Sequence, residues 1–134
     1  MYTALPQEAK DIRIEVFMKE QGFENEFDDI DTISHHIVVF DEGKPIGTCR
    51  FFKENDHYTI GRVAVLKAYR NQHIGNLLLI SAEKEIKKLN GDLIVVHAQV
   101  RVSPFYEKQG YIQFGQIDDD EGVPHMWMKK RIQH

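Results

Sequence analysis

The chain has 134 residues, of which 42% are apolar, so it can bury a core within one domain and is too apolar for a disordered chain. A formal charge of −4 argues against a general nucleic-acid binder, which usually carries a basic face. A single cysteine, no apolar run near the roughly 20 residues that cross a bilayer, and no signal segment predict a cytoplasmic protein without membrane contact.

The first half of the chain is predicted to hold one helix and three antiparallel strands. Pro6–Glu20 is predicted to be the helix, because Ile12 and Val16 are spaced i, i+4. An acidic, irregular segment follows over residues 22–34. Cys49 lies in a strand-like run, which favours a packed thiol over a nucleophile. Turns rich in Asp, Asn and Gly separate the three predicted strands, His36–Phe40, Pro45–Lys53 and Tyr58–Leu66.

The second half is predicted to alternate helices and strands. Ser103 is expected to be the N-cap of a short helix with Pro104 at its first position. An acidic turn is expected over residues 118–124. The predicted order is helix, strand, helix, strand and strand: Ile74–Asn90, Leu93–Val100, Ser103–Gln109, Tyr111–Ile117 and His125–Ile132. Together with the first half, this order predicts an α/β fold with a mixed sheet.

The most informative stretch, residues 60–78, reads as a buried strand, a short polar turn and the start of a helix. Backbone N–H groups at a helix N-terminus lack intrahelical partners, and the helix dipole adds positive charge there. Phosphate is a natural ligand for such a place. Lys67 and Arg70 supply further positive charge beside the turn. The stretch therefore indicates a protein that uses a nucleotide or a coenzyme.

These features resemble the GNAT superfamily of acyl-CoA N-acyltransferases. The resemblance rests on Arg62–Val65, on Phe105–Tyr111, and on Arg70–Gly75, which matches the pyrophosphate signature Gln/Arg-x-x-Gly-x-Gly/Ala. Other motifs are similar to a bacterial branch of the family, the ElaA and YjcF type proteins: Arg13–Gln21, the acidic segment ending at Asp31, His36, Ala98–Gln99 and Gly122–His125. The resemblance implies one GNAT domain over residues 1–134, with a mostly antiparallel, mixed sheet flanked by helices (α+β).

The chain departs from the family pattern in two places. His73 stands at the first signature glycine, and Asn71 stands where many relatives also have glycine. Asn tolerates a left-handed backbone, whereas the His73 side chain is expected to crowd the phosphate approach. Residues 1–5 are too few for the usual first strand, so this strand is expected to be shortened or missing. The exposed sheet edge could then pair with another chain, which favours a homodimer.

The resemblance implies direct attack of a primary amine, on a small molecule or a peptide, on the acetyl-CoA thioester. It implies that the Arg62 strand carries a bulge and splays from the next strand, so that pantetheine pairs with backbone there like an added strand. The Val65 N–H is the candidate oxyanion donor. The residues implied to hold the coenzyme are Val63, Ala64, Val65, Arg70, Asn71, Gln72, His73, Ile74, Gly75, Asn76, Ser103 and Tyr106.

Proton transfer needs an acid and a base. Tyr106 matches the family's general acid, since a phenol with a pKa of about 10 can protonate a thiolate with a pKa of about 8.5; the alternative is that Tyr106 only packs its helix onto the sheet. Many relatives carry a Glu on the central strand that acts as the base. Here the corresponding region is Gly61-Arg62, so this Glu is absent. His97 lies within an apolar run, which favours a hydrogen-bonded core histidine over a catalytic base. The candidates for the base are Glu26, Asp28, His97, Glu121 and His125, of which His125 and Glu121 are taken as catalytic.

Charged residues offer candidate acceptor contacts. Residues 24–31 hold five carboxylates, and Glu26 and Asp28 among them form either a rim that attracts an amine or a solvated loop. Arg50 and Arg62 lie on strands predicted to be neighbours. They could bind a substrate carboxylate, although internal pairing with Glu15 or Glu20 is favoured, since buried charges are seldom unpaired.

Three function classes are weighed. The leading one is an N-acetyltransferase that uses acetyl-CoA, with no metal and no nucleic-acid partner. The alternative is a non-catalytic module that senses or holds acyl-CoA, which His73, Asn71 and the missing central-strand Glu favour. A metal-dependent hydrolase lacks a credible ligand set, because His35-His36 beside Asp31 matches no established ligand spacing.

Overall fold

The computed structural model describes residues 1–22 and 27–132, which form a mixed sheet flanked by helices. The strand order is β1-β2-β3-β4-β6-β5. Neighbouring strands are antiparallel except β3 and β4, which are parallel. The strands are β1 (His35–Asp41), β2 (Lys44–Glu54), β3 (His57–Val65), β4 (Leu93–Gln99), β5 (Ile112–Asp120) and β6 (Val123–Arg131). The predicted α/β fold with a mixed sheet is confirmed.

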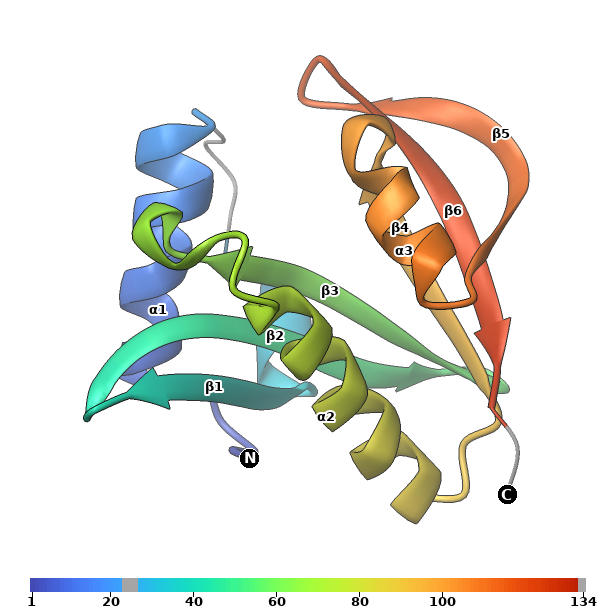
Figure 1. Ribbon diagram of the computed structural model, residues 1–134. Coiled ribbons are helices and arrows are strands. Elements are labelled where there is room, and N and C mark those ends of the chain that lie inside the picture. The colour runs from blue at the N-terminus through green and yellow to red at the C-terminus, as the bar shows by residue number, and fades with distance from the viewer. Residues whose placement is uncertain (23–26, 133–134) are drawn as a thin grey trace.

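Helices cover both faces of the β1–β3 half (Figure 1). Helix α2 (Ile74–Lys88) packs Leu78 and Ala82 against Phe51 and Ile60 in the main core. On the opposite face, Ile12 and other apolar residues of the first helical segment pack against β3 in a smaller cluster. The remaining helical elements are α1 (Gln7–Arg13), η1 (Ile14–Glu20), η2 (Asp29–Thr32), η3 (Lys67–Tyr69), η4 (Val100–Val102) and α3 (Ser103–Lys108).

Strands β3 and β4 pair over only three residues, Tyr58–Ile60 against Ile94–Val96, and then diverge (Figure 1). Just beyond, β3 bulges: Cys49 of β2 faces two residues of β3, and the first of them, Arg62, has a φ of 51°. A bulge of this kind bends its strand and strengthens the local twist. The implied bulge and splay are both confirmed, and the splay leaves the side of β3 that faces β4 without a neighbouring strand.

Some local predictions need correction. The helix over Pro6–Glu20 is α-helical only to Arg13 and continues as a π-helix, in which Gln21 N–H donates to the Val16 carbonyl. Ser103 is not an N-cap: Val102 holds that position and Ser103 is already helical, so its hydroxyl caps nothing. The acidic segment 118–124 is mostly strand.

The first strand of the family pattern is reduced to one bridge, in which Tyr2 and His36 exchange two hydrogen bonds of 2.7 Å. The expectation of a shortened strand is therefore confirmed.

In residues 1–22 and 27–132, no helix is long and apolar enough to cross a membrane.

Candidate active site

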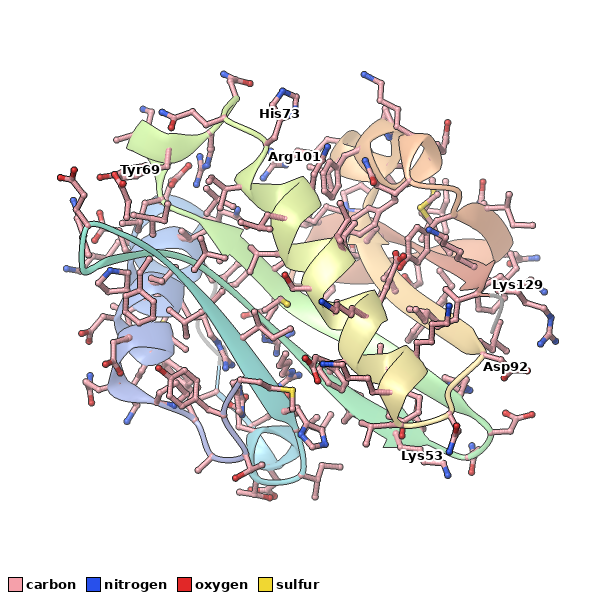
Figure 2. All side chains as sticks on the ribbon, turned by 60° about the horizontal axis from the view of Figure 1, so that its bottom comes forward. Lys53, Tyr69, His73, Asp92, Arg101 and Lys129 are labelled. Atoms are coloured by element: carbon pink, nitrogen blue, oxygen red, sulfur yellow. The ribbon has the colours of Figure 1, made fainter. Side chains whose placement is uncertain are left out.

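A groove of about 620 Å³ lies between the bulged end of β3, the start of α2 and α3. It is lined by most of the residues predicted to hold the coenzyme: Val63, Ala64, Val65, Arg70, Asn71, His73, Ile74, Gly75, Asn76 and Tyr106. Two predicted residues, Gln72 and Ser103, are not part of its lining. Figure 2 shows three lining residues, Tyr69, His73 and Arg101, toward the same end of the molecule.

The start of α2 presents backbone N–H groups to this groove. The first hydrogen bond of its ladder runs from Leu77 N–H to the His73 carbonyl, so the amides of residues 74–76 precede the ladder. The turn before it contains two left-handed residues, Asn71 with a φ of 68° and His73 with a φ of 62°. The turn therefore has the backbone path that glycines usually provide, although His73 keeps a side chain at the groove.

Gly75 allows the close approach of α2 and α3. A Cβ at this position would lie 3.1 Å from Cζ of Phe105. This is tighter than ordinary van der Waals contact, so Phe105 would have to shift by a few tenths of an ångström to accept a larger residue.

Arg70 does not present a free cation to the groove. Its Nε donates to the Val65 carbonyl over 3.0 Å, and its Nη atoms bind the Glu20 carboxylate. The hydrogen bond from Arg70 lowers the pKa of Glu20. Arg70 therefore ties the turn before α2 to the end of β3 and to η1.

The backbone of Val65 points into the splay. Leu66 N–H donates to the Ile46 carbonyl of β2 over 2.9 Å, so Leu66 and Ile46 are a hydrogen-bonded pair. Since such pairs alternate along an antiparallel ladder, Val65 opposite Gly47 is a non-hydrogen-bonded position whose N–H and C=O face away from β2. Ala64 is the opposite case. Its backbone faces β2, so only its side chain is available to the groove, contrary to the backbone pairing expected for it.

A second, smaller pocket of about 270 Å³ adjoins the groove. His97, His125, Glu121 and Arg62, all singled out from the sequence, line it. The lining residues common to both cavities are Gln21, Val63, Arg101, Val102 and Tyr106. The two cavities therefore meet where β3 and β4 diverge.

Two imidazoles lie together in the small pocket, their ring centroids 4.8 Å apart. His97 stacks on Trp127 at 4.3 Å, and its Nε2 lies 2.8 Å from Oδ1 of Asp118. His125 donates from Nδ1 to the Val123 carbonyl over 2.8 Å. The prediction of a hydrogen-bonded histidine at position 97 is confirmed, but the ring lines a pocket and is not enclosed in the core.

Tyr106 lines both cavities and is 7% exposed. Burial raises the pKa of its phenol, which keeps the hydroxyl protonated and makes proton transfer to a thiolate costlier than the ordinary phenol pKa of about 10 implies. Burial also raises the pKa of the nearby Cys49 thiol to about 12. Cys49 is therefore a packed thiol, as the sequence predicted, and no nucleophile.

The arginines of the central strands pair with the acidic segment. Arg50 binds Asp28 and Asp31 at 2.6 and 2.9 Å, and Arg62 lies 3.4 Å from Asp28. The expected partners Glu15 and Glu20 are wrong: Glu15 pairs with Lys19 on its own helix, and Glu20 pairs with Arg70.

These ion pairs also change how the acidic segment is understood. Burial alone raises the pKa of Asp28, but hydrogen bonds and charge from Arg50, with the charge of Arg62, outweigh it and lower the pKa. Asp28 is thus a structural counter-ion and a poor base. Asp31 is likewise bound by Arg13 over 2.8 Å. Glu26 lies outside the described residues.

Sequence reasoning missed Asp118, Arg101 and Gln21. The sequence pattern predicts a turn at Asp118, and its contact with His97 depends on a bulge in β5. Arg101 is the second residue after β4, and its position near the carboxyl end of a parallel strand is a signal that the sequence offers. Among residues 1–22 and 27–132, no cluster of three His, Cys, Asp or Glu side chains is arranged to hold a metal ion.

Comparison with known proteins agrees with this geometry. The family model described as "Acetyltransferase (GNAT) domain" matches residues 5–132. The uncharacterized N-acetyltransferase YjcF of Bacillus subtilis is 34% identical over 122 residues, covering 89% of this chain and 87% of its own. A Lactobacillus plantarum crystal structure, provisionally assigned as an N-acetyltransferase, is 30% identical with a TM-score of 0.91, covering 99% and 97% of the two chains.

Escherichia coli ElaA shares the same fold. Its crystal structure is 24% identical with a TM-score of 0.84, covering 92% of this chain and 88% of its own. The matched family model and the sequence relatives together show that this chain belongs to the GNAT acetyltransferase family.

Proposed function

We propose that the protein is an N-acetyltransferase that moves the acetyl group of acetyl-CoA to a primary amine of a small molecule or peptide by direct attack. The observation that carries this proposal is the junction of the two cavities. The outward-facing backbone of Val65 lies in the large groove, and Tyr106 lines both the groove and the small pocket. A thioester at the junction would face a backbone donor and a phenol at once.

The groove supplies the features that acetyl-CoA needs. The amides of residues 74–76, at the positive end of α2, suit the pyrophosphate. The open backbone at Val63 and Val65 suits pantetheine, which would pair with it as an added strand. The coenzyme would supply the activated acetyl group.

The chain's own residues then divide the remaining work. The Val65 N–H stabilises negative charge on the thioester oxygen. Tyr106 gives its proton to the departing sulfur. An alkyl amine has a pKa near 10.4, so it arrives as an ammonium and must lose a proton. The small pocket offers His97, His125 and Glu121 for that purpose.

The second candidate function is an acyl-CoA-binding or sensing module without catalysis. Two observations favour it: His73 keeps a side chain at the phosphate approach, and the Arg70 guanidinium is already bound to Glu20. Either feature could weaken coenzyme binding or turnover without changing the fold.

Calorimetric titration with acetyl-CoA, with dephospho-CoA as a control, tests the proposal first. Binding near micromolar, followed by turnover in a screen of primary amines, supports the enzyme. A Tyr106→Phe variant should then bind acetyl-CoA normally and lose most of its turnover. Tight binding with no turnover of any amine would favour the sensing module. No binding at millimolar acetyl-CoA would end both proposals.

We further propose a cytoplasmic location, since the one thiol is buried and unpaired. We also propose a homodimer formed through the outer edge of β1. Among the described residues, only Tyr2 pairs with this edge. Light scattering of the purified protein at several concentrations tests the dimer.

A further inference from the structure

We propose that His97 is the proton acceptor for the amine and that Asp118 is the residue that positions it. This inference rests on the proposed acetyl transfer. His97 directly follows Val96, the last β4 residue paired with β3, so it stands at the point where the strands separate. Since Val96 belongs to the main core, His97 projects from the other face of the sheet, where the small pocket lies.

An unusual bulge in β5 brings Asp118 to this imidazole. Phe114 pairs with Trp127 and Asp118 pairs with His125, so three residues of β5 lie opposite the single Met126 of β6. Gly115, with a φ of 73°, begins the bulge. The side chain of Asp118 reaches across β6 to a histidine two strands away. A regular ladder would not place residue 118 at this register.

The carboxylate sets the tautomer of His97. An ionised carboxylate only accepts hydrogen bonds, so Nε2 carries the hydrogen that is donated to Asp118. The hydrogen bond from His97 lowers the pKa of Asp118, which keeps that carboxylate ionised. Nδ1 then holds the lone pair, and stacking on Trp127 restrains the ring. This is the arrangement of a general base oriented by a carboxylate.

His125 is less suited to accept the proton. Its Nδ1–H is directed at a neutral carbonyl, and the residue is only 6% exposed. A carboxylate behind the ring stabilises the imidazolium better than a carbonyl does. Charged and titratable groups also face His97 from the elements around the pocket: His125 on β6, Asp118 and Asp120 on β5, Glu121 in the turn, Arg62 on β3 and Arg101 on η4.

Every proton in the proposed step has a donor and an acceptor. His97 Nδ1 takes one proton from the ammonium and releases it to water. The nitrogen lone pair forms the C–N bond as the C–S bond breaks. The sulfur takes the Tyr106 proton, and the second proton lost by the nitrogen restores the phenol through water. The products are an amide, the free thiol and one released proton.

Comparing two acceptor amines of different basicity distinguishes a catalytic base at position 97 from a residue that only supports the fold. Ethylamine is an ammonium at neutral pH and needs a base, whereas hydroxylamine is already unprotonated. With both at high concentration, His97→Gln should lower kcat/KM for ethylamine about 100-fold and leave hydroxylamine little changed. Asp118→Asn should show the same selectivity and shift the pH profile for ethylamine. His125→Gln is the matched control and should not discriminate between the amines. Equal losses for both amines in His97→Gln, or selective loss in His125→Gln, would overturn the proposal.

The tautomer gives a readout independent of turnover. In ¹⁵N spectra of histidine-labelled protein, His97 should carry its hydrogen on Nε2, and Asp118→Asn should change that population. A hydrogen on Nδ1 in the neutral wild-type ring would overturn the proposal even if acetyl transfer is active. If wild type binds no acetyl-CoA, the acetyltransferase proposal fails, and His97 then loses its role with it.

Discussion

Arg70 and Val65 are joined by a hydrogen bond from the guanidinium Nε to the carbonyl oxygen, 3.0 Å long. The bond links the turn proposed to hold the pyrophosphate to the strand end whose N–H is proposed to face the thioester. Because N–H and C=O of one strand residue face the same side, fixing the carbonyl also fixes the direction of the donor. Arg70 is therefore a positioning residue for the end of β3.

An Arg70→Lys variant should bind acetyl-CoA about tenfold more weakly in calorimetry, because Lys cannot make the forked contacts of Arg and a hydrogen bond to a charged group contributes roughly 1.5–3 kcal/mol. Glu20→Gln is the control, since it keeps the contact with Val65. Equal losses in both variants would show that the ion pair with Glu20 is what matters.

His73→Gly should raise both stability and acetyl-CoA affinity. A side chain in the left-handed region costs about 1–2 kcal/mol, which glycine avoids apart from its larger unfolded-state entropy. His73→Ala separates the two effects: it removes the imidazole from the groove and keeps the backbone strain. Urea unfolding and calorimetry measure the two quantities. If neither substitution strengthens binding, His73 does not crowd the coenzyme.

Gly75→Ala should destabilise the protein by about 1–3 kcal/mol in urea unfolding, because the new methyl group overpacks against Phe105. Combining it with Phe105→Leu should recover part of the loss. A double variant no better than the sum of the two single changes would contradict the proposed clash.

Arg50→Met should cost about 3 kcal/mol of unfolding free energy, since it removes the buried cation that Asp28 and Asp31 share and leaves Asp31 with Arg13 and Asp28 with the longer contact to Arg62. Lys19→Met removes one partner of the exposed pair with Glu15 and should change stability by less than about 1 kcal/mol. Comparable losses in the two variants would mean that the buried network contributes no more than a surface pair.

The buried His36 should make the protein less stable in mild acid. Burial lowers the pKa of its imidazole below the usual 6.5; the Asp31 carbonyl acts against this shift and the charges of Arg13 and Arg50 add to it. Below pH 6.5 the unfolded chain therefore binds a proton that the folded chain does not, and unfolding free energy falls until the folded pKa is passed. Urea unfolding from pH 8 to 5 should show this slope, and His36→Gln should reduce it. An unchanged slope would assign the pH dependence to other groups.

The sequence was sufficient for the succession of helices and strands and for the turn between β3 and α2. Both depend on local signals, the apolar runs and the short polar loop between β3 and α2. It was insufficient where a residue's role depends on a distant partner. Arg50 binds an aspartate 22 positions away, and nothing in the local pattern distinguishes that carboxylate from Glu15 or Glu20. The register of β5 was hidden for a similar reason, because the extra residues of its bulge look like ordinary strand.

Strand pairing joins the two halves of the sheet over three residue pairs, and the chain order divides at the same place. Everything through α2 belongs to one half, and β4 onward forms the other. During synthesis the first half of the chain is complete before the second half is made. Until then the edge of β3 that pairs with β4 has no neighbouring strand. A ligand that pairs with that edge would join the two halves and stabilise the folded chain by an amount that grows with the logarithm of its concentration above Kd. If the proposed coenzyme is that ligand, its concentration would set part of the unfolding free energy of the protein.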